Sequence, residues 1–179
     1  MTRFEQCLAF TLREEGGYIH NPADPGGATN AGITLYTLAE YVGRKCTVAE
    51  LKAMSPTVRN DIYLRHFWRV VYGDLLPVGI DLMVFDFGSG VTCCPETSVA
   101  ILQEALNVEA DGHVGQKTMA AMRALTPGAF IGILWWKQVH HYRSLPQYPL
   151  FGNGWEGRSE RRKMAAFAAV AANIEEIAA

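Results

Sequence analysis

Apolar residues recur at helical spacing along most of this 179-residue chain. At about 100° per residue, the first segment, Thr2 to Glu15, gathers its apolar side chains on one face of a helix. These side chains are Phe4, Cys7, Leu8 and Leu12. Periodicity and helix-capping residues predict further helices over residues 34–41, 47–50, 55–68, 97–106, 130–142 and 165–178. The pattern therefore predicts a mainly α protein.

Three stretches depart from this helical pattern. The apolar run Val78 to Phe87 fits a helix or a buried strand equally well on pattern alone. The pair Asp111-Gly112 predicts a tight turn. Leu145 to Leu150 contains two prolines, which predicts an extended loop between the last helices.

The stretch from Glu14 to Thr34 interrupts the helices with glycine, proline and short polar side chains. It reads E-E-G-G-Y-I-H-N-P-A-D-P-G-G-A-T-N-A-G-I-T. This composition is too rich in glycine and proline for a regular element, and any β-structure is expected as at most a small hairpin within Gly16 to Thr34. A loop of this kind beside the end of a helix is a common place for catalytic residues.

Glu15 is the first candidate for catalysis in this stretch. On the helical wheel it lies roughly 20° from the centre of the apolar stripe, whereas Glu14 lies about 80° away, at the rim. Gly16 and Gly17 then end the helix. A carboxyl group half removed from water at the negative end of a helix should have its protonated form favoured, as a general acid requires. The alternative is a carboxylate that simply faces solvent at the helix end.

Asp24 is the second candidate, because the Pro-rich tract around it allows the chain to turn back towards Glu15. Two carboxyl groups facing one cleft are what glycoside hydrolysis needs. Thr29 and Asn30 follow, and either could position a water molecule or bind a sugar hydroxyl. Asp-Pro-Gly is also a good turn sequence, so Asp24 as a simple turn residue stays open.

Composition and charge restrict the partners. The chain is 49% hydrophobic and 19% charged, with a net charge of −2, which is typical of a globular domain and gives no electrostatic case for binding nucleic acid. No signal peptide is apparent at the N-terminus, so we expect synthesis in the cytoplasm. The four cysteines and five histidines lack the spacing of a zinc site or a disulfide framework, and we predict reduced thiols, no metal and no cofactor.

The motifs E-G-G-Y and N-P-A-D-P-G-G-A-T-N-A-G-I-T resemble the signature of glycoside hydrolase family 108, bacterial and phage N-acetylmuramidases with a lysozyme-like fold. The resemblance implies that Glu15 is the catalytic acid. Its spacing to Asp24 is similar to that of phage-type lysozymes, which carry Glu, Asp and Thr in this order. Thr29 would be that threonine, although the gap from Asp24 is one residue shorter here.

The resemblance extends beyond this signature. It favours a helix over Val78–Phe87, and Phe67-Trp68 is similar to an aromatic pair of the family. The pattern L-Q-x-x-L…D-G-x-x-G-x-x-T resembles small peptidoglycan-binding helical modules. This implies a catalytic lobe over residues 1–90 and a peptidoglycan-binding-like lobe over 91–179, packed as one unit. The alternative is that the second lobe only supports the catalytic one. Arg158, in a family-like G-W-x-x-R motif, is a candidate partner for a carboxylate in the cleft.

These observations predict a monomeric peptidoglycan hydrolase that cleaves the β-1,4 bond between N-acetylmuramic acid and N-acetylglucosamine. Tyr18, Asn30 and Trp68 are the expected substrate contacts. A lytic transglycosylase and a non-catalytic peptidoglycan-binding scaffold are the alternatives. A muramidase without a signal peptide would act in the cell wall, either as a phage endolysin released through a holin or as a secreted antibacterial effector with an immunity protein.

Overall fold

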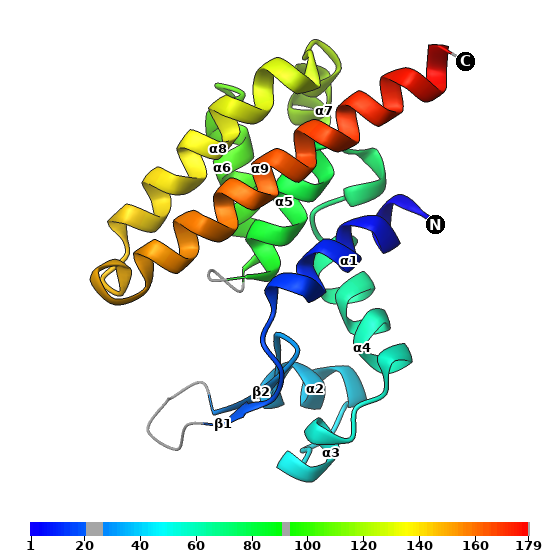
Figure 1. Ribbon diagram of the computed structural model, residues 1–179, viewed down its shortest axis with the longest axis vertical. Helices are drawn as coiled ribbons and strands as arrows, with labels where there is room; N and C mark the ends of the chain where they lie inside the picture. Colours follow the sequence, from blue (N-terminus) through cyan, green and yellow to red (C-terminus); the bar gives the residue numbers. More distant parts are fainter. Residues whose placement is uncertain (21–26, 91–93, 179) are drawn as a thin grey trace.

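The computed structural model describes residues 1–20, 27–90 and 94–178 (Figure 1). The helices are α1 (Arg3–Glu14), α2 (Leu35–Val42), α3 (Val48–Lys52), α4 (Pro56–Tyr63), α5 (Ile80–Ser89), α6 (Pro95–Ala105), α7 (Gln116–Arg123), α8 (Pro127–Ser144) and α9 (Tyr148–Ala178). A π-helical turn, η1 (Leu64–Trp68), extends α4, and a 3-10 turn, η2 (Gly73–Leu75), precedes α5. The predicted mainly α class is confirmed.

Hydroxyl side chains begin several of the helices at the predicted residues. Thr2 and Thr47 each form a capping box, in which the threonine Oγ1 accepts from the backbone of a glutamate that in turn accepts from the threonine N–H. Thr34 and Ser55 cap α2 and α4 in the same way with their hydroxyl oxygens. These caps satisfy backbone N–H groups that have no partner within the helix.

Helix α5 is the centre of the core. Every residue from Ile80 to Ser89 is buried, and α1, α6, α8 and α9 all pack against it (Figure 1). A helix that is covered on all sides needs no polar face, so its sequence shows no amphipathic period. This explains why the pattern of Val78–Phe87 did not by itself distinguish a helix from a strand.

A small antiparallel sheet lies in the lower part of Figure 1, beside α2 and α3. Its strands β1 (Ile19–His20), β2 (Ala28–Asn30) and β3 (Ile33–Thr34) follow in chain order, with β2 in the middle. Thr29 pairs with Ile19 on one side and with Thr34 on the other. The sheet lies within the predicted stretch, Gly16 to Thr34, and has one strand more than the predicted hairpin.

The last part of the chain corrects a prediction. Residues Leu145 to Leu150 do not form an extended loop: a turn covers 145–147, and α9 begins at Tyr148 and continues unbroken to Ala178. Pro149 is tolerated because it occupies the first turn of the helix, where its missing N–H has no partner to lose. Packing along α8 keeps the glycine-rich start of α9 helical.

A buried amide joins α6 to the turn before α7. The Gln103 side chain donates to Asp111 Oδ1 at 2.8 Å and to Thr118 Oγ1 at 3.0 Å, and its oxygen accepts from the N–H of Gly112 at 2.8 Å. These residues belong to the L-Q-x-x-L…D-G-x-x-G-x-x-T pattern of the sequence, and here they stabilise a turn. Peptidoglycan binding by this lobe stays a prediction. In the described part of the chain, no helix combines the length and apolar character needed to cross a membrane.

Candidate active site

Glu15 lies where α1 ends, at the junction between the helices and the small sheet. It is the C-cap of α1, and its backbone N–H still donates to Thr11 O at 3.0 Å. Its own backbone is extended (φ −78°, ψ 138°), so the chain leaves the helix here and enters the sheet. The side chain is only 16% exposed, and Arg158 Nη1 donates to its Oε1 at 2.6 Å.

Arg158 reaches Glu15 from α9 and is held in place by a buried carboxylate. Its Nη2 donates to Asp86 Oδ1 at 2.7 Å and its Nε to Asp86 Oδ2 at 3.1 Å. Asp86 also accepts from Thr11 Oγ1 and from Arg162 Nη1, both at 2.9 Å. Thus α1, α5 and α9 meet in one buried network of charges whose outermost member is Glu15.

The positive and negative charges of this network stabilise each other. Burial raises the pKa of Asp86, but the guanidinium groups of Arg158 and Arg162 outweigh it and hold that pKa below its usual range. Burial alone would lower the pKa of Arg158, yet Asp86 and then Glu15 raise it well above its usual value. Asp86 is therefore ionised in the folded protein, and Arg158 carries a permanent positive charge beside Glu15.

The turn between β2 and β3 closes the other side of Glu15. Its two residues, Ala31 and Gly32, both have positive φ (47° and 77°), as a two-residue turn in a twisted hairpin requires. A Cβ atom on Gly32 would lie 2.3 Å from Tyr63 Oη and 3.0 Å from Glu15 Oε2. The Tyr63 hydroxyl donates to Ala31 O at 3.0 Å, so it holds this turn against the carboxyl group.

Tyr63 belongs to the same electrostatic unit. Burial, and after it the carboxylate of Glu15, raises the pKa of the Tyr63 phenol well above its usual range. The phenol therefore stays protonated and acts only as a hydrogen-bond donor near Glu15.

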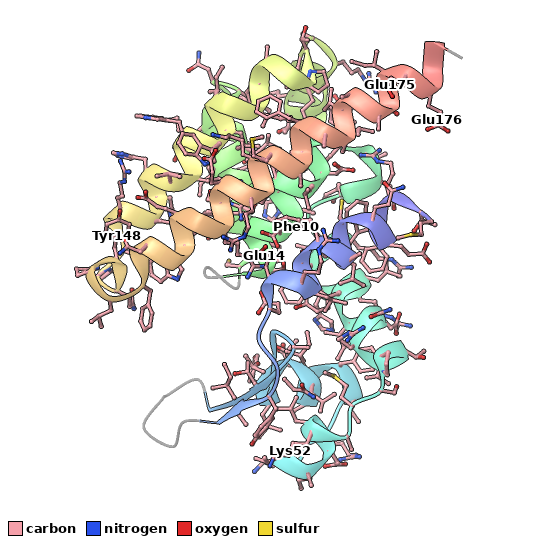
Figure 2. The ribbon with its side chains drawn as sticks, viewed as in Figure 1. Phe10, Glu14, Lys52, Tyr148, Glu175 and Glu176 are labelled. Carbon is pink, nitrogen blue, oxygen red and sulfur yellow. The ribbon has the colours of Figure 1, made fainter. Side chains whose placement is uncertain are left out.

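Glu14 has a different environment from its neighbour. Its two carboxylate oxygens accept from Arg161 on α9, at 2.9 Å from Nε and 2.6 Å from Nη2, and the Arg161 side chain is 60% exposed. Figure 2 shows Glu14 at the end of α1, where α9 passes over it. Glu14 thus joins α1 to α9 through an exposed arginine, and its own side chain is 13% exposed, so it is as shielded as Glu15 but has a different partner.

Two comparisons with known proteins identify the family of this chain. The sequence profile of glycosyl hydrolase 108 matches residues 8–91. The solved structure of Brucella abortus SagA is 38% identical, with a TM-score of 0.86 over 93% of this chain and 95% of the SagA chain. The chain belongs to glycosyl hydrolase family 108. No curated protein sequence matches it significantly.

Family membership makes the protein a glycoside hydrolase with a lysozyme-like fold, and supports peptidoglycan as its class of substrate. The matched segment, residues 8–91, contains Glu15, Gly32 and Tyr63 but ends before Arg158. The guanidinium that pairs with Glu15 therefore comes from outside the segment that defines the family-108 profile.

Thr29 and Asn30, predicted near the catalytic acid, lie on opposite faces of β2. The Asn30 amide donates to Leu51 O at 2.9 Å, which ties the sheet to α3. Successive side chains of a strand alternate, so Thr29 points to the face away from α3. Thr29 is half-buried, and its catalytic role stays a prediction, whereas the amide of Asn30 is used in a structural contact.

The structure separates the two aromatic residues predicted to contact substrate. Trp68 has no exposed surface: its Nε1 donates to Asp74 Oδ1 at 3.0 Å and its ring lies against Phe4 and Phe85. Trp68 is therefore a core residue, and the prediction that it contacts substrate is wrong. Tyr18 is half-buried, and the Lys52 ammonium lies 4.3 Å from the centre of its ring.

Asp24 lies outside the described residues. Among the residues that are described, no group of three or more His, Cys, Asp or Glu side chains is arranged to hold a metal ion. The sequence reasoning missed Asp86, Gly32 and Tyr63. Asp86 could have been found from the sequence, because it is a charged residue inside the apolar run Val78–Phe87. A charge buried in such a run requires a partner.

Proposed function

We propose that this family-108 protein is an N-acetylmuramidase that hydrolyses the β-1,4 bond between N-acetylmuramic acid and N-acetylglucosamine in peptidoglycan. The observation that carries the proposal is the shielded Glu15 carboxyl group at the junction of helices and sheet, paired with Arg158 at 2.6 Å. Glycoside hydrolysis requires a carboxylic acid to protonate the leaving oxygen.

Glu15 is the proton donor in this proposal. When it transfers its proton to the glycosidic oxygen, it becomes a carboxylate, and Arg158 stabilises the charge that develops. The guanidinium does not need to move for this, because Asp86 already holds it with two hydrogen bonds. The Gly32 turn lies close against the other carboxyl oxygen, where even an added Cβ atom would be only 3.0 Å away, so the acid has little room on this side.

The second half of the mechanism rests on Asp24 and Thr29. Asp24 stabilises the oxocarbenium-like transition state or, with Thr29, orients the attacking water. Thr29 lies in the central strand of the sheet, on the face away from α3.

The test compares two adjacent glutamates. Glu15→Gln keeps the shape of the side chain but has no proton to donate, and we expect release of soluble muropeptides from purified peptidoglycan to fall about 10²- to 10⁴-fold. Glu14→Gln is the matched control, because its side chain is as shielded as that of Glu15 but its carboxylate pairs with Arg161 and not with Arg158. We expect that control to keep activity close to that of the wild type.

Mass spectrometry of the products decides the reaction. A muramidase yields fragments that end in reducing N-acetylmuramic acid. Anhydro-muramic ends would instead identify a lytic transglycosylase, and reducing N-acetylglucosamine ends would refute the assignment of the bond. Near wild-type turnover by Glu15→Gln would show that Glu15 is not the acid, and retention on peptidoglycan without any release would identify a binding scaffold.

A further inference from the structure

The face of α9 that carries Arg158 continues towards the α8–α9 tip as an exposed aromatic surface. Phe151, Trp155 and Arg158 follow each other at i, i+4 and i+7, so they share one face of the helix. The Phe151 and Trp155 rings are stacked, with centroids 5.9 Å apart and an interplanar angle of 27°. Phe151 is 55% exposed. At 1.5 Å per residue it lies about 10 Å along the helix from Arg158.

Trp155 connects this surface to the core. Its ring lies 5.5 Å from that of Tyr142 on α8, and it is half-buried. Phe151 therefore rests on an aromatic side chain that is itself anchored, which gives a rigid flat surface near the tip that Tyr148 marks in Figure 2.

Gly154 leaves space beside these rings. It falls on the same face of α9, between Phe151 and Arg158, and a Cβ atom there would meet nothing within 4 Å. The nearby Gly152 is different, because a Cβ atom there would lie 2.5 Å from the Tyr148 ring. Packing thus explains the glycine at 152 but not the one at 154. Glycine destabilises the interior of a helix, so the one at 154 has a cost that packing does not explain.

We propose that the Phe151–Trp155 stack, with Gly154 beside it, is a sugar-binding surface for the glycan strand on one side of the scissile bond. This inference rests on the proposed function and adds a binding site to it. The flat apolar face of a pyranose ring stacks on an exposed aromatic ring. The bare backbone at Gly154 lets the strand continue along α9 towards Arg158 and Glu15.

The shared helix face is what favours a glycan over another occupant. A ligand that lies on Phe151 and follows this face is directed towards Arg158, whose side chain is 12% exposed and whose guanidinium is bonded to the catalytic carboxyl group. The matched comparison is Trp136 on α8, which is 54% exposed and stacked on His140 at 5.3 Å. The two surfaces have the same exposure and ring stacking, but only Phe151 shares a face with Arg158.

The experiment measures retention of the full chain on insoluble peptidoglycan in a Glu15→Gln background, so that the substrate is not degraded. Adding Phe151→Ser should weaken retention about three- to tenfold, the loss expected for one aromatic contact. Adding Trp136→Ser should leave retention unchanged, and Phe151→Tyr, which keeps the ring, should restore it. Circular dichroism on each variant shows that the helices are intact.

The outcomes separate this inference from the proposed function. If the wild type releases muropeptides but Phe151→Ser and Trp136→Ser are retained equally, the sugar-binding surface is refuted and the muramidase proposal stands. If the wild type releases nothing, the muramidase proposal fails, and the retention assay still decides the surface. If sedimentation velocity shows that Phe151→Ser dissociates a dimer, a second copy of the chain covers Phe151 and the inference is overturned.

Discussion

Replacing Asp86 by Asn tests the buried charge network directly, because it removes one charge with almost no change in shape. Oδ1 of Asp86 accepts from Thr11 and Arg158, and Oδ2 accepts from Arg158 and Arg162. An asparagine retains one oxygen acceptor, and its NH₂ group would face guanidinium N–H groups. Donors would then oppose donors at a site with no exposed surface.

The cost can be estimated from burial. Arg162 has no exposed surface, so its charge would be left without a partner ion in the core. Removing one member of a buried pair costs about 3–5 kcal/mol. For a domain of this size, the melting temperature should fall by about 6–20 °C.

Asp81→Asn is the matched control, since Asp81 is also buried on α5. Its partner Arg3 has a side chain that is 35% exposed, and Arg3 also donates to Leu76 O. Water and this carbonyl remain available to Arg3 after the change, so we expect a cost of about 1 kcal/mol or less.

The two aspartates should also differ in their dependence on pH. Asp86 has its pKa lowered on folding, so its contribution is present above about pH 4 and is lost as pH falls through the folded pKa. Burial outweighs Arg3 and raises the pKa of Asp81, so its protonated form is favoured below about pH 4 and that gain is lost as pH rises. The melting temperature of Asp86→Asn should therefore fall less on acidification than that of the wild type. Asp81→Asn should not show this smaller dependence on acid.

Thermal unfolding followed by circular dichroism, at neutral pH and in acid, measures all of this. A melting temperature for Asp86→Asn within about 2 °C of the wild type at neutral pH would refute the reasoning, since it would mean a cost near 1 kcal/mol or less. An equal fall in melting temperature for Asp81→Asn would also refute it, because it would show that removing either charge from α5 has the same effect.

Three glycine substitutions give further predictions. Gly32→Ala should abolish muropeptide release and lower the melting temperature, because φ is +77° and the added Cβ would clash with Tyr63 Oη at 2.3 Å. Gly154→Ala should stabilise α9 by about 1 kcal/mol and raise the melting temperature by about 2–4 °C. Gly152→Ala should lower it, since the Cβ would meet the Tyr148 ring at 2.5 Å; equal shifts at 152 and 154 would contradict the packing argument.

Local chemistry explains the parts of the fold that could be predicted. Hydroxyl caps such as Thr2, Thr34 and Ser55 act on backbone N–H groups two or three residues away, so the sequence alone reveals where those helices begin. The helical wheel places Glu15 near the apolar stripe and Glu14 at the rim, but the two side chains are equally shielded, at 16% and 13% exposed. What separates the two glutamates is their tertiary partner, Arg158 for Glu15 and Arg161 for Glu14.

Tertiary packing explains what local reasoning missed. Trp68 would show the same helical spacing in the sequence whether its ring lined a cleft or lay in the core. Only its contacts with Phe4 and Phe85 show that it belongs to the core. The start of α9 contains glycine and proline, which locally favour a loop. Contacts with α8 compensate for that weak propensity, and the 31-residue helix continues through it.

The partner of Glu15 lies 143 residues away in sequence, yet part of this pairing has a signal in the sequence. Asp86 sits in an apolar run, and a carboxylate buried there needs a cation. Arg158 and Arg162 are four residues apart, so they lie on one face of a helix and can reach the same carboxylate. Arg158 comes one turn earlier on α9 than Arg162 and pairs with both Asp86 and Glu15. The buried Asp86 carboxylate requires a cation, and the arginine that satisfies it also pairs with Glu15, the proposed catalytic acid.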